Sequence, residues 1–113
     1  MSLKIVYLDD EVSLCEIFKD SFESSEVDIK TFSEPELALK HIKAHPPDLI
    51  FLDYRLPGTT GDLIALELGG HIPKVLITGD LSVTPSANFL RIFKKPYKFQ
   101  EMDDFISQFF QQS

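Results

Sequence analysis

An open α/β sheet is the fold class that the sequence predicts, and three observations indicate it. Five short apolar runs alternate with segments of helical periodicity, in the order (βα)₅. Two of the runs are apolar apart from a single lysine in the first, which is typical of parallel strands that are buried on both faces. Each of these two runs ends in acidic residues. Such alternation predicts parallel strands joined by right-handed crossovers, with helices on both faces of the sheet.

Three strands are expected in the first half of the chain. Leu3–Leu8 is rich in branched and aromatic residues, Leu49–Asp53 has four apolar residues followed by one carboxylate, and both predict fully buried strands. Val27–Phe32 alternates apolar with polar residues, which is typical of a half-covered strand near a sheet edge. Each strand is followed by a turn or an acidic residue that ends the apolar run.

Two helices are expected between these strands. Large apolar residues recur every four positions over Val12–Phe22 and predict one helix with an apolar stripe. Ser33 and Glu36 have the S-x-x-E capping spacing, and a proline stands between them in the expected first turn. The second helix is therefore expected to begin here and to run to about Ala44. Two consecutive prolines then end it.

The second half of the chain predicts two more strands and two more helices. A loop at Gly58–Gly61 is expected before a short apolar helix at Leu63–Leu68. Strands are expected at Lys74–Gly79 and Phe89–Phe93, and an amphipathic final helix at Phe99–Phe110.

The helix between the fourth and fifth strands is expected to be shortened. Residues 80–88 contain Pro85 and several small polar residues. Proline and short polar side chains disfavour a helix interior, so the segment has room for one or two turns at most.

Composition limits the possible classes of protein. The 113 residues, 43% of them hydrophobic, suffice for a single domain over residues 1–113. A net charge of −7 disfavours direct nucleic-acid binding by this chain. Cys15 is the single cysteine, and the amino-terminal apolar run is too short for a signal peptide or a membrane span. We therefore expect a cytoplasmic protein without a membrane segment.

Five polar residues follow the predicted strands at the edge where their carboxyl ends meet: Asp9, Asp10, Asp53, Thr78 and Lys95. In an open α/β sheet this edge is where ligands bind. Each residue alone has an ordinary explanation, such as a helix cap or a solvated strand end. Together, three acids near one another repel unless a cation lies among them, and Mg²⁺ suits oxygen ligands best.

Four segments of the chain resemble the signature segments of receiver domains from two-component response regulators. They are Tyr-Leu-Asp-Asp-Glu, Leu-Ile-Phe-Leu-Asp-Tyr-Arg-Leu-Pro-Gly, Val-Leu-Ile-Thr-Gly and Lys-Lys-Pro-Tyr, and the similarity runs from about Leu3 to Phe110. The resemblance implies a CheY-like, flavodoxin-like three-layer sandwich whose five parallel strands have the order 2-1-3-4-5.

The resemblance also implies a role for each acid. Asp53 would be the nucleophile that accepts a phosphoryl group from a phosphohistidine, forming an aspartyl phosphate. Asp10 would ligate Mg²⁺ directly and Asp9 through water, while Asp53 and the backbone carbonyl of Arg55 would complete the protein ligands.

Further site residues come from the same resemblance. Lys95 would contact the phosphoryl oxygens as a point charge, and Thr78 would donate its hydroxyl to them. Gly79 would leave room for the phosphate. The Lys95–Pro96 bond is expected to be cis.

The switch that accompanies phosphorylation departs from the family pattern. Thr78 would move toward the phosphate while an aromatic residue of the fifth strand rotates inward. The position of that aromatic residue is occupied here by Ile92. Because the neighbouring helix is also shortened, the output surface should differ from that of other receivers.

Two charged residues flank the expected phosphoryl site. Arg55 lies two residues after Asp53, and Asp80 lies two residues after Thr78. Two solvated loop charges are the simpler interpretation, because exposed ion pairs are weak. The hypothesis kept beside it is that the two side chains pair across the site and slow hydrolysis of the phosphoryl group.

The three histidines are expected at the surface. His41, His45 and His71 have no carboxylate or cysteine partner at metal-ligand spacing. The sequence therefore assigns them no function.

Two functional interpretations follow from these residues. The favoured one is a Mg²⁺-dependent phosphoacceptor of a phosphorelay, self-phosphorylating rather than a turnover enzyme, whose donor is a sensor histidine kinase or phosphotransfer protein and whose output partner is a protein. The alternative is a receiver-fold interaction module that needs no phosphorylation. A phosphatase of the haloacid dehalogenase type is disfavoured, because Arg55 stands where that family needs a second aspartate.

Overall fold

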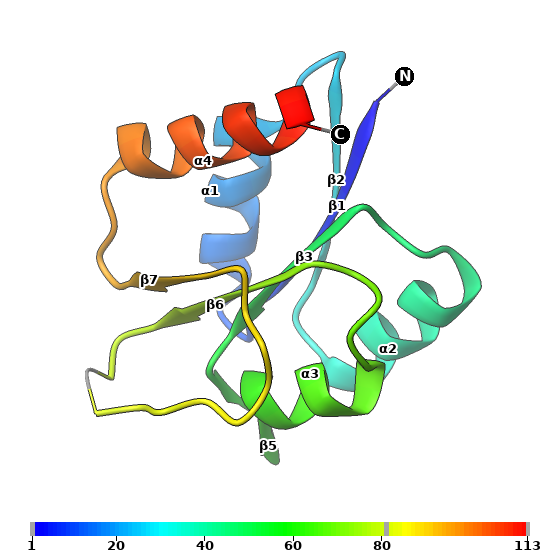
Figure 1. The fold of residues 1–113 in the computed structure, drawn as a ribbon, viewed down its shortest axis with the longest axis vertical. Coiled ribbons are helices and arrows are strands. Elements are labelled where there is room, and N and C mark those ends of the chain that lie inside the picture. The colour runs from blue at the N-terminus through cyan, green and yellow to red at the C-terminus, as the bar shows by residue number, and fades with distance from the viewer. Residues whose placement is uncertain (1, 81, 113) are drawn as a thin grey trace.

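The computed structural model describes residues 2–80 and 82–112. Its centre is a parallel sheet of five strands with the order β2-β1-β3-β6-β7 (Figure 1). The strands span Leu3–Leu8 (β1), Val27–Phe32 (β2), Leu49–Asp53 (β3), Lys74–Thr78 (β6) and Arg91–Lys94 (β7). This order is the predicted 2-1-3-4-5 order of the five main strands.

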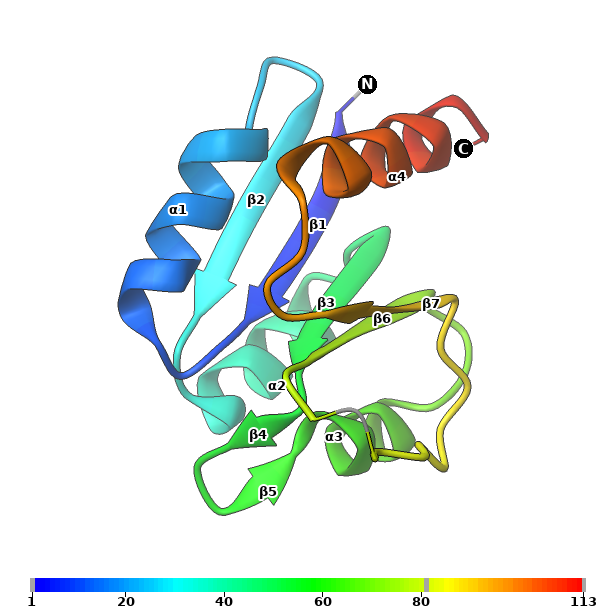
Figure 2. The same ribbon diagram turned by 90° about the vertical axis from the view of Figure 1, so that its left-hand side faces the viewer.

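Four helices complete a three-layer sandwich (Figure 2). On one face of the sheet lie α1 (Val12–Phe22) and α4 (Phe99–Gln112), and on the other face lie α2 (Pro35–Ala44) and α3 (Gly61–Leu68). Each helix buries one apolar stripe against the sheet, which is the arrangement that the alternating sequence predicts.

The core is divided by the sheet into two layers. Tyr7 and Phe51 face α1 and α4, and the rings of Tyr7 and Phe18 stack with centroids 4.1 Å apart. Val6 is next to Tyr7 on β1 and Leu52 is next to Phe51 on β3. Adjacent strand residues point to opposite faces, so Val6 and Leu52 face α2 and α3. β3 is therefore buried throughout, and β1 is buried on both faces apart from the exposed Lys4, as their largely apolar sequences predict.

The fifth main strand begins two residues later than predicted. Its pairing with β6 runs from Arg91 to Lys94, whereas the prediction was Phe89–Phe93. Phe89 instead packs as a half-buried residue against the layer formed with α2 and α3. An apolar residue that packs beside the sheet has the same local sequence pattern as a strand residue, which is why the predicted boundary is too early.

The loop predicted at Gly58–Gly61 is a short hairpin that leads directly into a helix. β4 (Arg55–Leu56) pairs with β5 (Thr59–Thr60) around Gly58, whose φ of 71° suits glycine. The hydroxyl of Thr60 accepts the backbone N–H of Leu63 and caps α3, so this helix begins at Gly61 rather than at Leu63.

Two other helix ends also differ from the prediction. The Ser33 cap of α2 is wrong, because the N-cap residue is Glu34 and its side chain makes no capping hydrogen bond. Pro35 stands in the first turn, where the backbone N–H that proline lacks would have no partner within the helix. The helix therefore begins there without such a cap. The final helix continues two residues beyond Phe110, to Gln112.

The segment between β6 and β7 confirms that the helix expected between the fourth and fifth main strands is shortened. None of the described residues in it, 79–80 and 82–90, is helical. The carboxylate of Asp62 on α3 accepts the backbone N–H groups of Ser86 and Ala87, both at 2.8 Å. This contact holds the loop against α3 in place of helix packing.

Within residues 2–80 and 82–112, no helix is both long and apolar enough to cross a membrane. The Lys95–Pro96 peptide bond is cis, as the resemblance implies.

Candidate functional site

Three carboxylates meet at the carboxyl end of the sheet. Asp9 follows β1 and Asp53 ends β3, and these strands are direct neighbours with Leu8 opposite Leu52. One oxygen from each of Asp9, Asp10 and Asp53 lies within 4.8 Å of the others. Asp9 and Asp53 are buried, while Asp10 is exposed. The acidic cluster (Asp9, Asp10 and Asp53) is thus where the sequence predicted it.

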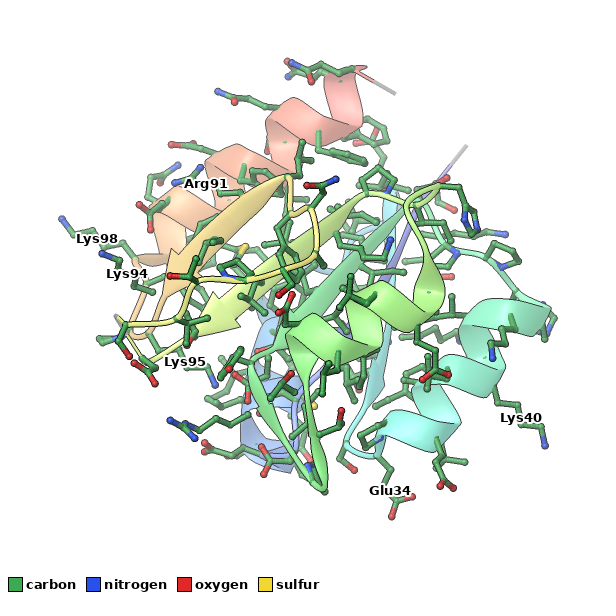
Figure 3. The ribbon with its side chains drawn as sticks, turned by 60° about the horizontal axis from the view of Figure 1, so that its bottom comes forward. Glu34, Lys40, Arg91, Lys94, Lys95 and Lys98 are labelled. Atoms are coloured by element: carbon green, nitrogen blue, oxygen red, sulfur yellow. The ribbon has the colours of Figure 1, made fainter. Side chains whose placement is uncertain are left out.

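Lys95 reaches into the acidic cluster from the end of β7. Its ammonium nitrogen lies 2.9 Å from Asp53 Oδ1 and 3.2 Å from Asp9 Oδ2. Its backbone N–H donates to the carbonyl of Thr78 at 2.8 Å, which anchors the start of the loop to β6. Figure 3 shows that Lys94 and Lys98, by contrast, point outward at the same edge. Lys95 is therefore the lysine of this region that faces the site.

The electrostatics of the site reflect crowded negative charge. Burial, followed by the charge of Asp9, raises the pKa of Asp53 above its ordinary value, although the contact with Lys95 opposes this. Burial also disfavours the charged form of Lys95, but its bonds to Asp53 and Asp9 outweigh this and raise its pKa. Lys95 therefore remains protonated. A further cation beside the three carboxylates of the acidic cluster would also be favourable.

Asp9 is held by groups that the sequence did not single out. The hydroxyl of Tyr7 donates to Asp9 Oδ2 at 3.2 Å, and the backbone N–H of Glu11 donates to Asp9 Oδ1 at 3.0 Å. Burial first, and then the negative charge of Asp9, raise the pKa of Tyr7, so that its hydroxyl keeps its proton. The thiol of Cys15 donates to the Asp9 carbonyl at 3.2 Å, and burial raises its pKa to about 11. The sequence offers one indication of the contact between Tyr7 and Asp9. Tyr7 stands two positions before Asp9, and side chains two positions apart in extended chain point to the same side.

Thr78 and two oppositely charged residues line the hollow beside the acidic cluster. This hollow has a volume of about 590 Å³. Thr78 is buried at the end of β6, and its hydroxyl oxygen accepts the backbone N–H of Asp80 at 3.0 Å. The guanidinium of Arg55 lies 3.0 Å from Asp80 Oδ2. The pairing of Arg55 with Asp80, which the sequence offered as a hypothesis, is present.

Two glycines stand beside the site, one of which the sequence analysis missed. A Cβ placed on Gly61 would lie 2.4 Å from the backbone carbonyl oxygen of Asp53, which is far too close. A side chain is therefore excluded where α3 begins against the acceptor strand. At Gly79 a Cβ would lie 4.0 Å from Lys95 Cβ, an ordinary contact. The sequence pattern places Gly61 at the end of a loop, which explains a glycine there without its close approach to Asp53.

Ile92 lies outside this hollow. It is 41% exposed on β7, opposite Leu76, while the next residue, Phe93, is buried against the α1 and α4 layer. Ile92 is absent from the described residues that line the hollow. The structure thus brings together Asp9, Asp10, Asp53, Arg55, Thr78 and Lys95, and leaves Ile92 apart from them.

The donor set of the acidic cluster fits a hard cation. Its three side chains offer oxygen atoms alone, and one of the three is open to solvent. Mg²⁺ takes oxygen ligands, retains several waters and commonly uses one or two carboxylates together with a phosphate. The residues present are therefore suited to Mg²⁺.

A comparison with protein families identifies the chain. The sequence model of the response regulator receiver domain matches residues 5–107, almost the whole chain. The chain belongs to this family. Receiver domains are regulatory modules of two-component systems, and the resemblance found in the four sequence segments is confirmed.

Two curated relatives carry the same relationship at the level of sequence. The alkaline phosphatase synthesis transcriptional regulatory protein PhoP of Bacillus subtilis is 38% identical over 68 residues, 60% of this chain and 28% of the relative. The transcriptional regulatory protein BaeR of Escherichia coli is 30% identical over 80 residues, 69% of this chain and 33% of the relative. The receiver chain thus matches a third or less of the length of either relative.

Solved structures share the fold over almost the entire chain. A receiver domain from Methanospirillum hungatei superposes with a TM-score of 0.88 and 18% identity, covering 99% of this chain and 96% of that one. The response regulator TrrA of Thermotoga maritima, solved in complex with Mg²⁺-BeF, has a TM-score of 0.83 and 25% identity, covering 95% of this chain and 98% of its own.

Proposed function

We propose that this receiver domain is a phosphoacceptor in a two-component phosphorelay. A carboxylate oxygen of Asp53 attacks the phosphorus of a phosphohistidine on a sensor histidine kinase or a phosphotransfer protein. The new P–O bond forms as the P–N bond breaks, and the imidazole leaves with the bonding electron pair and takes up a proton. The product is an aspartyl phosphate.

The observation that carries this proposal is the position of the Lys95 ammonium between two buried carboxylates. It lies 2.9 Å from Asp53 Oδ1, so a phosphoryl group bonded to Asp53 would have this cation beside its oxygens. A fixed charge that faces the position where negative charge develops stabilises the transition state without reorganisation. Thr78, buried at the same edge, would turn its hydroxyl proton from the Asp80 carbonyl oxygen, 3.4 Å away, to the phosphoryl oxygens.

The acidic cluster would hold Mg²⁺ as the resemblance implies. Asp10 and Asp53 would ligate it directly, Asp9 through water, and the carbonyl of Arg55 would complete the protein ligands. When bound, Mg²⁺ supplies positive charge that offsets the charge of the carboxylates and of the phosphoryl group. The role of Asp9 is also to keep Lys95 in place, through the ion pair at 3.2 Å.

A protein donor is supported by an apolar groove beside Lys95. The groove holds about 450 Å³ between α1 and the loop before α4, and Ile17 and Phe99 on its walls are 59% and 55% exposed. Large apolar side chains exposed next to a reactive centre are typical of a docking surface. A histidine on a docked helix could approach Asp53 from this side.

The alternative function, a receiver-fold interaction module independent of phosphorylation, has specific support as well. The switch position holds the exposed Ile92 instead of an aromatic residue, and the described part of the segment after β6 contains no helix. Against this alternative, crowding of three acids is unfavourable, as the raised pKa of Asp53 indicates, and a module without phosphoryl chemistry has no physical reason to keep it.

Phosphorylation by a small donor separates the two functions. The chain is incubated with acetyl phosphate and Mg²⁺ and is analysed by intact mass spectrometry, with Asp53→Ala as the matched control. We expect one phosphoryl adduct on the wild type and none on the variant. A chain that takes up no phosphoryl group from acetyl phosphate or from any histidine kinase is an interaction module instead.

The metal requirement is tested separately with beryllofluoride, a mimic of the phosphoryl group. We expect its complex with the wild type to weaken when Mg²⁺ is removed and to weaken equally in Asp10→Ala. Equal beryllofluoride affinity with and without Mg²⁺ would contradict the assignment of the acidic cluster to this cation.

A further inference from the structure

Two histidines lie together at the C-terminal end of α2. His41 is in the last turn and is half-buried against Phe32, with ring centroids 5.1 Å apart, while His45 is the exposed C-cap residue. The backbone N–H of His45 donates to the His41 carbonyl at 2.7 Å and closes this last turn. Both side chains line an open groove of about 530 Å³ that also includes Lys4 and Ile5 from the start of β1. The histidine pair (His41 and His45) therefore lies at the opposite edge of the sheet from the acidic cluster.

The separation of the two rings matches that of two imidazoles bound to one metal ion. A nitrogen lies about 1.1 Å from its ring centroid, so a zinc ion about 2.1 Å from each nitrogen stands about 3.2 Å from each centroid. At a tetrahedral angle of about 110°, two such centroids are about 5.2 Å apart. The centroids of His41 and His45 are 5.3 Å apart, with the rings inclined at 40°. The centroid separation is thus the one expected for two imidazoles that share a metal ion.

We propose that His41 and His45 form a site for a first-row transition-metal dication such as Zn²⁺ or Cu²⁺, separate from the Mg²⁺ site. Imidazole is a ligand that these metals prefer, whereas Mg²⁺ prefers oxygen. Among the described residues, the acidic cluster is the one group of three or more ligating side chains, so water fills the remaining positions at the histidine pair. Two protein ligands predict a weak, exchangeable site.

The surroundings of the pair favour a cation in two respects and oppose it in one. The C-terminal end of α2 directs the partial negative charge of its last carbonyls toward the site. Asp28 lines the same groove and offers a carboxylate, while Lys4 and Lys30 on its walls contribute positive charge.

Calorimetric titration of the full, tag-free chain with Zn²⁺ tests this proposal. Excess Mg²⁺ is present throughout, so that the acidic cluster is occupied. We expect one equivalent of Zn²⁺ to bind, with at least about tenfold weaker binding in His41→Ala and in His45→Ala. His71→Ala, which removes an exposed histidine elsewhere, is the matched control and should bind as the wild type does. Cu²⁺ should bind more tightly than Zn²⁺ and show the same dependence on both residues.

Several results would overturn the proposal. Zn²⁺ affinity that is unchanged in either alanine variant would exclude a paired site, and binding abolished by excess Mg²⁺ would assign the metal to the acidic cluster. Because His45 is exposed, His45→Ala should keep the fold, which circular dichroism and the melting temperature without metal would check. That variant decides the outcome even if His41→Ala, with its contact to Phe32, does not fold.

Discussion

Replacement of Gly61 by alanine should damage both the stability of the chain and the acceptor site. The added Cβ would lie 2.4 Å from the carbonyl oxygen of Asp53, whereas ordinary contacts between carbon and oxygen are about 3.3–3.6 Å. One of the two backbone segments must therefore move by about 1 Å. Because Asp53 ends a buried strand and Gly61 begins α3, neither segment can move freely.

The size of the effect follows from this displacement. Overpacking costs about 1–3 kcal/mol, and a contact this short with backbone belongs at the upper end. Alanine returns at most about 1 kcal/mol through its higher helix propensity, so we expect a net loss of about 2 kcal/mol in the free energy of unfolding. A shift of about 1 Å at Asp53 would also lengthen its 2.9 Å bond to Lys95 and slow phosphorylation roughly 10- to 100-fold.

Urea unfolding and the initial rate of phosphorylation by acetyl phosphate measure the two effects. Gly70→Ala is the matched control, because a Cβ there meets nothing within 4 Å and the residue has no positive φ. The control should change neither quantity. A Gly61→Ala variant as stable and as rapidly phosphorylated as Gly70→Ala would refute the steric reasoning.

Three further perturbations test other parts of the site. Arg55→Ala removes the 3.0 Å pair with Asp80 and should speed loss of the phosphoryl group several-fold, while stability changes by less than about 0.5 kcal/mol because the arginine side chain is 77% exposed; an unchanged dephosphorylation rate ends that hypothesis. Because the pKa of the Asp53 carboxyl is raised above 3.8, the folded chain binds the carboxyl proton more firmly than the unfolded chain does. The free energy of unfolding therefore falls as pH rises from 3.8 through the raised pKa of the folded chain. In Mg²⁺-free buffer, the melting temperature of Asp53→Asn relative to the wild type should therefore increase as the pH rises above 3.8, and a difference that does not change with pH would contradict the shift. Asp62→Ala removes the acceptor of two loop N–H groups and should cost about 1–2 kcal/mol and speed hydrogen exchange in residues 82–90; unchanged exchange there would show that the loop is held by other contacts.

The sheet and the acidic cluster could be predicted because they depend on strong and local signals. Leu3–Leu8 and Leu49–Asp53 are largely apolar runs that lead into or end in acid, and parallel pairing brings the ends of neighbouring strands together. Lys95 could be placed at this edge because it follows the fifth predicted strand, but its role beside the phosphoryl group came from the resemblance. Its two ion pairs come from residues far apart in the chain.

Other features could not be predicted because they depend on tertiary contacts. The steric role of Gly61 is decided by the backbone of Asp53, which the sequence does not place beside it. Phe89 has the composition of a strand residue but packs beside the sheet, so the strand boundary was wrong by two residues. His45 lies beside His41 because its backbone N–H still closes the last turn of α2, a detail of helix termination that sequence patterns locate poorly.

The central claim is that Asp53, among three neighbouring carboxylates, accepts the phosphoryl group. Borohydride reduces an aspartyl phosphate to homoserine, so peptide mapping of the reduced, phosphorylated chain locates the acceptor. We predict conversion at Asp53 alone, because this carboxylate lies 2.9 Å from the Lys95 ammonium and borders the open hollow. Conversion at Asp9 or Asp10, or at none of the three, would contradict the account.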